Sequence, residues 1–353
     1  MDRNDTTMNR EFYAAFYYIS TLYGLLPIQE QIRLLLLVIQ GYYYPFLAIL
    51  GVPVTIVTIG ILSKGRCGLS RCVSRYLVAM ATADLLVIIF DLMLRHIPIV
   101  YSEKFNFLRD IPVCNIHAIL LYAATDYSVW FTVTFTFDRF VAICCQKLKT
   151  KHCTEKRARV ILGTVSVLSC LKNIFWYFML TNQYWMMNSP WFCLVFKGTL
   201  ESEFWVTIEF LHNIITPVVP FVLILLLNVL TIRHILVTSR VRRRLHADSS
   251  KESHKDPEME SRRKSMILLF VISANFIVLW SVLMVFSIWN RMWFLGYKSI
   301  FLDDVVLVVG FMLQLLSCCT NTCIYTVTQN KFRKQFKNVL KYPFTKIAQL
   351  IPC

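Results

Sequence analysis

Charged side chains are scarce in this sequence. Asp, Glu, Lys and Arg make up only 16% of the 353 residues, whereas hydrophobic residues make up 56%, and the mean hydropathy is +0.54. A soluble domain of this length needs many more polar residues to cover its surface. The composition therefore excludes an ordinary soluble protein and favours one that lies in a membrane.

Seven apolar runs are long enough to cross a hydrocarbon core of about 30 Å as helices. They cover approximately residues 39–63, 74–98, 112–145, 158–181, 205–236, 264–290 and 301–328. The polar connections are short, so we predict one all-α domain, a seven-transmembrane helix bundle over residues 39–328. Residues 1–38 would form an extracellular N-terminal segment. Its apolar part, 11–38, lacks the basic front and cleavage site of a signal peptide, and we expect it to lie on the bundle or the membrane surface.

Motifs of two other kinds of membrane protein are missing. No H-E-x-x-H or G-x-S-x-G occurs, and His96, His117 and His212 are too scattered to read as metal ligands. We therefore expect no enzyme and no metal site. Transporters usually carry an internal repeat with paired broken helices, and we find no convincing repeat. A seven-span transporter or channel is the alternative function.

The net charge of +16 is distributed unevenly over the loops. If the loops alternate between two sides, one side holds 25 Lys and Arg residues and the other holds 9. Because Lys- and Arg-rich loops stay in the cytoplasm, we expect a multi-pass plasma-membrane protein with its N-terminus outside and its C-terminus inside. The basic third cytoplasmic loop, 239–263, and the tail, 329–353, would attract anionic lipid and partners. We do not expect nucleic-acid binding.

The same topology sorts the twelve cysteines. Only Cys114, at the start of the third run, and Cys193, in the long loop after the fourth, face outside. Two thiols in an oxidising compartment predict one disulfide, which would tether that loop over the mouth of the bundle. The sequon at Asn4 also lies on the outer side, where glycosylation requires it.

An aspartate lies midway along the second run. An ionisable side chain at this depth costs about 2.5–3.5 kcal/mol on insertion scales. Asp84 could simply bond to its helix neighbours, or it could belong to a polar cluster that holds a cation. Ser128 of the third run, and Ser317 and Asn321, four residues apart on the seventh, are the expected partners. Beyond a structural Na⁺ at this cluster, we expect no cofactor.

Asp138 and Arg139 stand side by side at the cytoplasmic end of the third run. Arg139 alone could extend its charge to the lipid headgroups. An interfacial anchor gains nothing from an adjacent anion, however. A charge that is held in one state and released in another fits the pair better and gives it a switching role.

These residues resemble the motifs of the rhodopsin-like (class A) G-protein-coupled receptors. Asp138-Arg139-Phe140 is similar to Asp-Arg-Tyr, with Phe140 in place of Tyr, and Cys114 has the family spacing from Arg139. "ATAD" at 81–84 matches the span-2 motif. The remaining matches are the span-6 aromatic pair, the span-5 proline and the ends of Asn-Pro-x-x-Tyr, at Phe276, Trp280, Pro220, Asn321 and Tyr325. The segment after span 7 resembles the family's short amphipathic membrane-surface helix.

The sequence departs from the family pattern at several positions. Thr55 replaces the span-1 Asn, Asn228 the span-5 Tyr, Val282 the span-6 Pro and Thr322 the span-7 Pro, and span 4 lacks its Trp. Losing two prolines removes the expected kinks of spans 6 and 7. Within the class, "VTFTFDRFVAIC" and "LLSCCTNTCIY" look most like the orphan, peptide-receptor-like branch that contains probable G-protein-coupled receptor 139.

The resemblance implies an extracellular ligand and a heterotrimeric G protein as partners. Arg139 would be freed to meet the C-terminal helix of a Gα subunit in a cleft between spans 3, 5 and 6. The residues that the resemblance assigns to coupling and switching are Asp138, Arg139, Phe140, Phe276, Trp280, Asn321 and Tyr325.

The outer half of the bundle holds the ligand-pocket candidates. They are Asp91, Arg95, Leu121, Asp126, Glu209, His212 and Trp289. Asp91 and Arg95 could be an intrahelical salt bridge, and His212 a hydrogen-bonded core residue. Leu121 stands where aminergic receptors place an aspartate, which disfavours a monoamine, and span 7 has no lysine for retinal. The mixed charges suggest a zwitterionic or peptide ligand.

Overall fold

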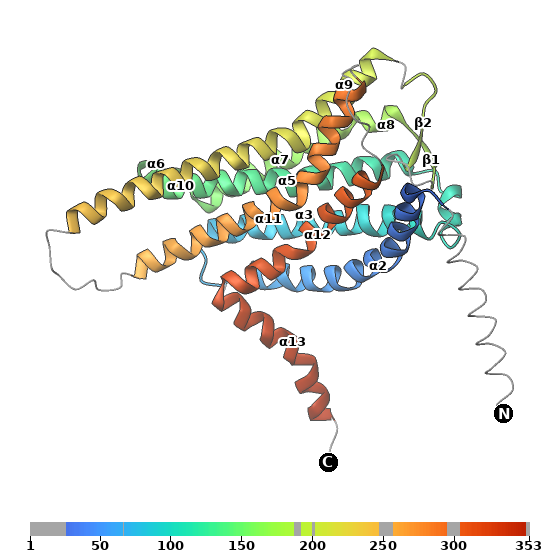
Figure 1. Ribbon diagram of the computed structural model, residues 1–353. Helices are drawn as coiled ribbons and strands as arrows, with labels where there is room; N and C mark the ends of the chain where they lie inside the picture. Colours follow the sequence, from blue (N-terminus) through green and yellow to red (C-terminus); the bar gives the residue numbers. More distant parts are fainter. Residues whose placement is uncertain are drawn as a thin grey trace.

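The computed structural model describes residues 26–65, 67–186, 192–199, 202–246, 257–294 and 304–350. Within these residues, seven helices are long and apolar enough to cross a membrane. They lie side by side in one bundle (Figure 1). The predicted all-α, seven-transmembrane fold is therefore confirmed.

Several spans are built from more than one element. The first four comprise α2 (Ile28–Ser63); α3 (Arg71–Val87), π-helix η1 (Ile88–His96) and α4 (Ile97–Val100); α5 (Cys114–Cys144); and α7 (Glu155–Asn173) with α8 (Phe175–Met179). The last three comprise α9 (Glu203–Asn213), η3 (Ile214–Val218) and α10 (Val219–His246); α11 (Pro257–Phe294); and α12 (Asp304–Thr328). The connections contain η2 (Asn106–Asp110), α6 (Gln146–His152), β1 (Leu180–Tyr184) and β2 (Cys193–Val195), and α13 (Asn330–Leu350) follows the last span.

Some helices are longer than their apolar runs. The first begins at Ile28, so the boundary expected at residue 39 lies inside α2. The expected loop 239–263 is helical at both ends, because α10 runs to His246 and α11 begins at Pro257. An apolar run marks the part of a helix that lies in the hydrocarbon core. Polar residues can extend the same helix beyond the core. The sequon at Asn4 lies outside the described residues.

Local sequence signals explain where several helices begin and bend. The Ser70 hydroxyl accepts a hydrogen bond from the Val73 amide at 3.3 Å, and Thr154 does the same for Arg157 at 3.4 Å. These caps satisfy amides that have no partner in the first turn of α3 and α7. Pro45 and Pro53 lie inside α2, which curves visibly in Figure 1, as helices with internal prolines do.

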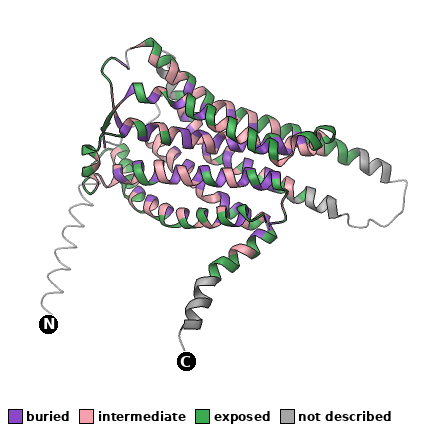
Figure 2. Cartoon of the chain, turned by 180° about the vertical axis from the view of Figure 1, so that it is seen from behind, coloured by how far each residue is buried: buried purple, intermediate pink, exposed green. Residues whose placement is uncertain are grey.

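The α5 helix lies at the centre of the bundle. It packs against α3, α7, α10 and α11, and the β-hairpin covers its first turns. Buried residues gather on the faces that the helices turn toward one another, while exposed residues cover the outside (Figure 2). Lipid tails are as apolar as Leu, so helix association in a membrane relies on close packing and hydrogen bonds. The functional side chains therefore lie where α5 meets its neighbours.

A short antiparallel hairpin closes one end of the bundle. Strands β1 and β2 pair through Leu180–Val195 and Tyr184–Cys193. A disulfide joins Cys114, the first residue of α5, to Cys193 of β2. The predicted pairing is confirmed, and it fixes the hairpin to the central helix across a sequence separation of 79 residues.

A glycine allows α11 and α12 to approach closely. A Cβ atom added to Gly310 of α12 would lie 3.1 Å from Cα and 3.2 Å from N of Leu283 on α11. These are backbone atoms, which cannot turn aside as a flexible side chain can. Small residues at such crossings let helix backbones pack tightly in membranes.

We expect Gly310→Ala to lower the thermal unfolding temperature of the purified protein, because α11 would have to shift to admit the methyl group. Gly163→Ala is the matched control, since a Cβ there meets no heavy atom within 4 Å. Alanine favours a helix over glycine by about 1 kcal/mol, so the control should be neutral or stabilising. Equal melting temperatures for the two variants would contradict the close crossing.

Candidate functional site

Asp138 and Arg139 form a buried ion pair at the end of α5 that lies away from the hairpin. Arg139 Nε donates to Asp138 Oδ2 at 3.1 Å, and Nη2 contacts the same oxygen. The two residues are only 5% and 7% exposed. Arg139 therefore does not extend to lipid headgroups, and its neighbour holds the guanidinium inside the bundle.

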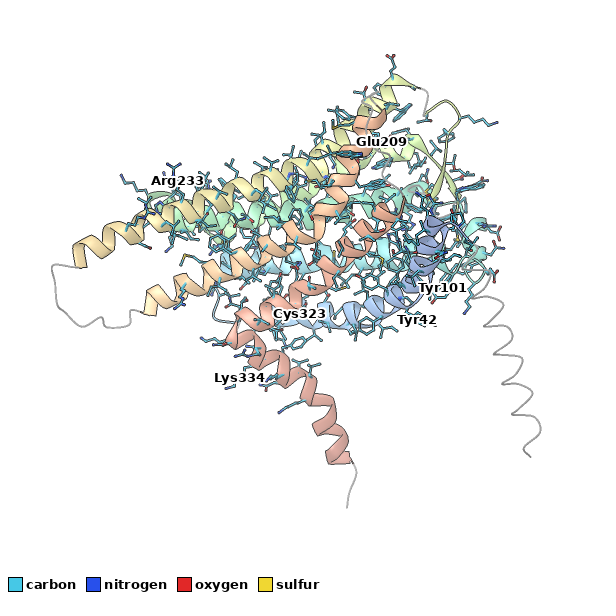
Figure 3. All side chains as sticks on the ribbon, viewed as in Figure 1. Tyr42, Tyr101, Glu209, Arg233, Cys323 and Lys334 are labelled. Carbon is cyan, nitrogen blue, oxygen red and sulfur yellow. A yellow bond between two sulfur atoms is a disulfide. The ribbon has the colours of Figure 1, made fainter. Side chains whose placement is uncertain are left out.

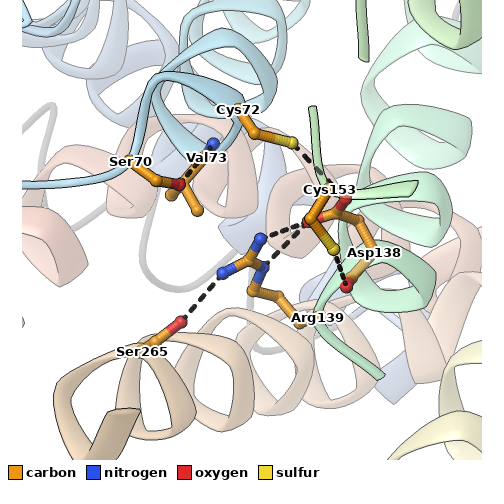
Figure 4. Close-up of polar contacts among 7 residues, drawn as sticks. All are labelled: Ser70, Cys72, Val73, Asp138, Arg139, Cys153 and Ser265. Carbon is orange, nitrogen blue, oxygen red and sulfur yellow. Dashed lines mark hydrogen bonds and ion pairs between the residues drawn. The ribbon is translucent and has the colours of Figure 1, made fainter. Parts of the chain in front are cut away.

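Two thiols hold Asp138 from the other side (Figure 4). Cys72 of α3 donates to Asp138 Oδ1 at 3.4 Å, and Cys153 donates to the Asp138 carbonyl oxygen at 3.6 Å. Burial, followed by the nearby Asp138 carboxylate, raises the pKa of the Cys153 thiol to about 11. The thiol thus stays protonated near neutral pH and acts as a donor. Sequence reasoning missed both thiols.

Arg139 also links α5 to α11. Its Nη1 atom donates to the Ser265 hydroxyl at 3.2 Å, and Figure 4 shows the guanidinium lying between Asp138 and Ser265. Ser265 lies 126 residues from Arg139 in sequence, and no sequence motif marked it. The neighbouring Phe140 is half-buried.

Asp84 joins three helices in the middle of the bundle. Its Oδ1 accepts from the Ser128 hydroxyl of α5 at 2.8 Å, and its Oδ2 accepts from the Asn321 amide of α12 at 2.7 Å. Ser317, the fourth residue of the predicted cluster, instead accepts from Asn275 of α11 at 3.3 Å. Ser128 and Asn321 are therefore placed as the sequence predicted, and Ser317 faces the next helix.

The oxygen atoms around Asp84 fit a hard cation. The carboxylate of Asp84 and the hydroxyl of Ser128 are ligand types that hard cations take in proteins, whereas Asn321 turns its amide nitrogen toward the carboxylate. Among the described residues, no Lys, Arg or His forms an ion pair with Asp84. A cation would thus supply the charge that the protein itself does not.

The motif aromatics of spans 6 and 7 form two separate ring pairs. Phe276 and Trp280 of α11 stack with ring centroids 5.3 Å apart. Tyr325 of α12 packs edge-on against Phe332 of α13 at 6.0 Å. All four rings are buried, so the motif residues of spans 6 and 7 pack in the interior.

Asp91 anchors a charged cluster in the half nearer the hairpin. Arg95 donates to Asp91 at 3.2 Å, and His96 Nε2 lies 3.3 Å from the same oxygen. A π-helix brings i and i+5 together, so η1 lets one carboxylate reach both residues. The Arg95 guanidinium also lies 4.7 Å from the Phe311 ring centre and 5.6 Å from that of Phe192. The intrahelical pair was predicted, and the π-helical register that adds His96 was not.

Asp126 lies in a second buried cluster, which joins three spans. Its Oδ1 accepts from Lys172 Nζ at 2.8 Å and from the Thr216 hydroxyl at 2.7 Å, and Asn173 donates to Oδ2. The Asp126 side chain is 1% exposed and that of Lys172 20%. Three donors from two other spans reach Asp126, and these contacts fix α5 against α7 and η3.

The other pocket candidates differ in how far they are buried. His212 is buried among the rings of Tyr122, Phe175 and Trp176, with centroids 5.2–5.7 Å away. Leu121 is buried too, whereas Trp289 is 36% exposed. Glu209 is half-buried on α9, and Figure 3 shows it near the hairpin end, with Arg233 far along α10.

We expect Asp126→Asn to destabilise the protein, because it leaves the Lys172 charge buried without its anion. Removing one partner of a buried pair costs about 3–5 kcal/mol. The double variant Asp126→Asn with Lys172→Met should recover part of the loss, which a double-mutant cycle of thermal unfolding measures. Ser166→Ala, whose hydroxyl bonds only within α7, is the neutral control. Strictly additive losses would contradict the ion pair.

One family model matches most of the chain. It is described as the 7 transmembrane receptor (rhodopsin family), and it covers residues 54–325. The matched range begins inside α2 and ends at Tyr325 in α12, so it contains both clusters around Asp84 and Arg139. The match disfavours the transporter or channel alternative.

Proposed function

The chain belongs to the rhodopsin family of seven-transmembrane receptors, and from this membership we propose that it binds an extracellular ligand and activates heterotrimeric G proteins. The receptor is a multi-pass membrane protein. The observation that carries the coupling proposal is the contact of Arg139 with both Asp138 and Ser265. The Ser265 contact holds α5 to α11 at the end where a G protein would bind.

The proposed switch is a change in what Arg139 contacts. In the described packing, Asp138 neutralises the guanidinium and Ser265 ties it to α11. Separation of α11 from α5 breaks the Ser265 contact and opens a cleft for the C-terminal helix of a Gα subunit. A ligand shifts this equilibrium only by its differential affinity for the two packings. A few kcal/mol is enough to populate a minor state.

The coupling proposal extends to the orientation and the interior of the bundle. An outer N-terminus and a cytoplasmic α13 are supported by the 25-to-9 distribution of Lys and Arg, and a plasma-membrane location by the receptor family to which the chain belongs. Phe276, Trp280, Asn321 and Tyr325 would relay the shift from the outer to the inner half. We also propose Na⁺ at Asp84, and the peptide-receptor-like orphan branch as the closest one.

We propose that the ligand carries one negatively charged and one positively charged group. Arg95 is a buried guanidinium that lies between Asp91 and two aromatic rings, and a guanidinium binds a carboxylate through charge-assisted hydrogen bonds. Glu209 is half-buried toward the same end, where it can meet an ammonium group. A zwitterionic amino-acid-like molecule or a peptide satisfies both residues.

We expect Arg139→Ala to abolish G-protein dissociation in cells, both basal and ligand-driven. Ser265→Ala should instead raise basal signalling severalfold, because it removes one tie between α5 and α11. Ser281→Ala is the control on α11, since its hydroxyl bonds only to Val278 of the same helix. Surface expression is measured for every variant. Unchanged signalling in Arg139→Ala at equal expression would overturn the coupling proposal.

We expect Arg95→Lys and Glu209→Gln each to weaken agonist potency by tenfold or more. The probes are a library of short peptides and free amino acids, screened first on the wild type by G-protein dissociation. Arg109→Lys, on the short helix η2, is the matched control for the loss of a guanidinium. Potency that is unchanged in both pocket variants would exclude this pocket.

A further inference from the structure

A groove on the outside of the bundle has no part in the proposed signalling. It has a volume of about 840 Å³, within the roughly 300–1,000 Å³ of pockets that bind one small molecule. It lies where α5 begins, α8 ends and the chain enters β1 (Figure 1). Its lining includes Ile116 of α5, Tyr177 and Phe178 of α8, Asn182 and Gln183 of β1, and Phe196.

The apolar wall of the groove continues the lipid-facing surface. Ile116 and Phe178 are 48% and 60% exposed. Contact of such apolar side chains with water would be unfavourable. One turn deeper on the same two spans, Leu120 and Ile174 are each 44% exposed. These side chains form a stripe that hydrocarbon covers in the membrane. The groove therefore opens toward lipid rather than into the helix bundle.

The polar wall lies beyond the ends of the helices. Asn182 and Gln183 belong to β1 and are exposed, and within the described residues their side-chain amides make no hydrogen bond. Tyr177 of α8 also lines the groove and is 46% exposed. Aromatic rings with one polar tip concentrate at the boundary between hydrocarbon and headgroups. The polarity of the groove thus changes along its length as the membrane itself does.

The chemistry of the lining limits which polar group the ligand can carry. None of the nine lining residues is charged. A phosphate or a carboxylate would need Arg or Lys for binding of any strength, so this lining disfavours phospholipids and fatty acids. Amide and hydroxyl side chains both donate and accept, and they match an alcohol.

The aromatic walls select the body of the ligand. Tyr177 and Phe178 contact each other edge-on at 5.5 Å, and Phe196 adds a third exposed ring. Flat rings offer a large contact area to a rigid ring system. A flexible acyl chain would lose conformational freedom on binding, whereas a fused-ring molecule loses little.

We propose that this groove binds a sterol, with its hydroxyl group on Asn182 and Gln183 and its rings against Tyr177 and Phe178. The site lies outside the bundle and is separate from the ligand pocket and from the coupling end. Because the disulfide fixes the hairpin to α5, the two walls stay in register. A sterol in the groove would contact β1, which covers the outer end of α5, and would affect the position of this strand.

The test is photolabelling of the full-length protein in membranes with a diazirine-bearing cholesterol analogue, followed by mass spectrometry of the labelled peptides. We expect labelling of the α8–β1 segment to saturate and to be displaced by cholesterol but not by cholesterol sulfate. Ile116→Trp, which fills the groove, should lower it at least fivefold. The pair Asn182→Leu with Gln183→Leu should lower it severalfold without touching a buried residue.

Val167→Trp is the matched control, because Val167 is 59% exposed on α7 and does not line the groove. Labelling that does not saturate, or that is equal in all variants, would identify ordinary lipid contact and overturn the proposal. So would equal saturable labelling by a photoreactive phosphatidylcholine. The readout requires neither agonist nor G protein, so its failure leaves the receptor proposal intact. Should Ile116→Trp fail to fold, the two surface substitutions still decide the outcome.

Discussion

A charge inside a bilayer has no water to solvate it, and this constraint organises the interior of the molecule. Four aspartates are buried in the described residues: Asp84, Asp91, Asp126 and Asp138. Three of them pair with a basic side chain, and the fourth accepts two hydrogen bonds from neutral donors. Each buried carboxylate needs partners that replace water, but these partners lie on different elements. The identity of those partners decides what each aspartate does.

Where the partners lie on other spans and complete the charge balance, the aspartate fixes the fold. Asp126 is of this kind, since Lys172 and Thr216 tie it to α7 and η3. Where the cation is the next residue, the pair can change its outside contacts without leaving a charge unpaired. Asp138 and Arg139 therefore combine a permanent local pair with a contact to Ser265 that can break. Local pairing makes the distant contact reversible at modest cost.

The sequence predicts what depends on hydrophobicity, sidedness and motif spacing. The seven spans, the Cys114–Cys193 disulfide and the approach of Ser128 and Asn321 to Asp84 follow from these patterns. Contacts across helices depend in addition on how far each helix is rotated about its own axis. No pattern in the sequence specifies that angle, which is why Ser265, Cys72 and Cys153 escaped notice. At Asp91 the reason is local, because a π-helical turn moves the register by one residue and adds His96.

The absence of an internal proline does not make α11 straight. The helix has 38 residues and no proline after its first, yet it changes direction along its length in Figure 1, so the bend expected to disappear with the span-6 proline is present. Its path of about 57 Å is nearly twice the ~30 Å hydrocarbon core. Its tight crossing with Gly310 is at Leu283, about 17 Å of helix from the hairpin end and about 39 Å from Pro257. The close backbone contact therefore holds α11 near one end, and the longer part, which carries Ser265, lies on the other side of it.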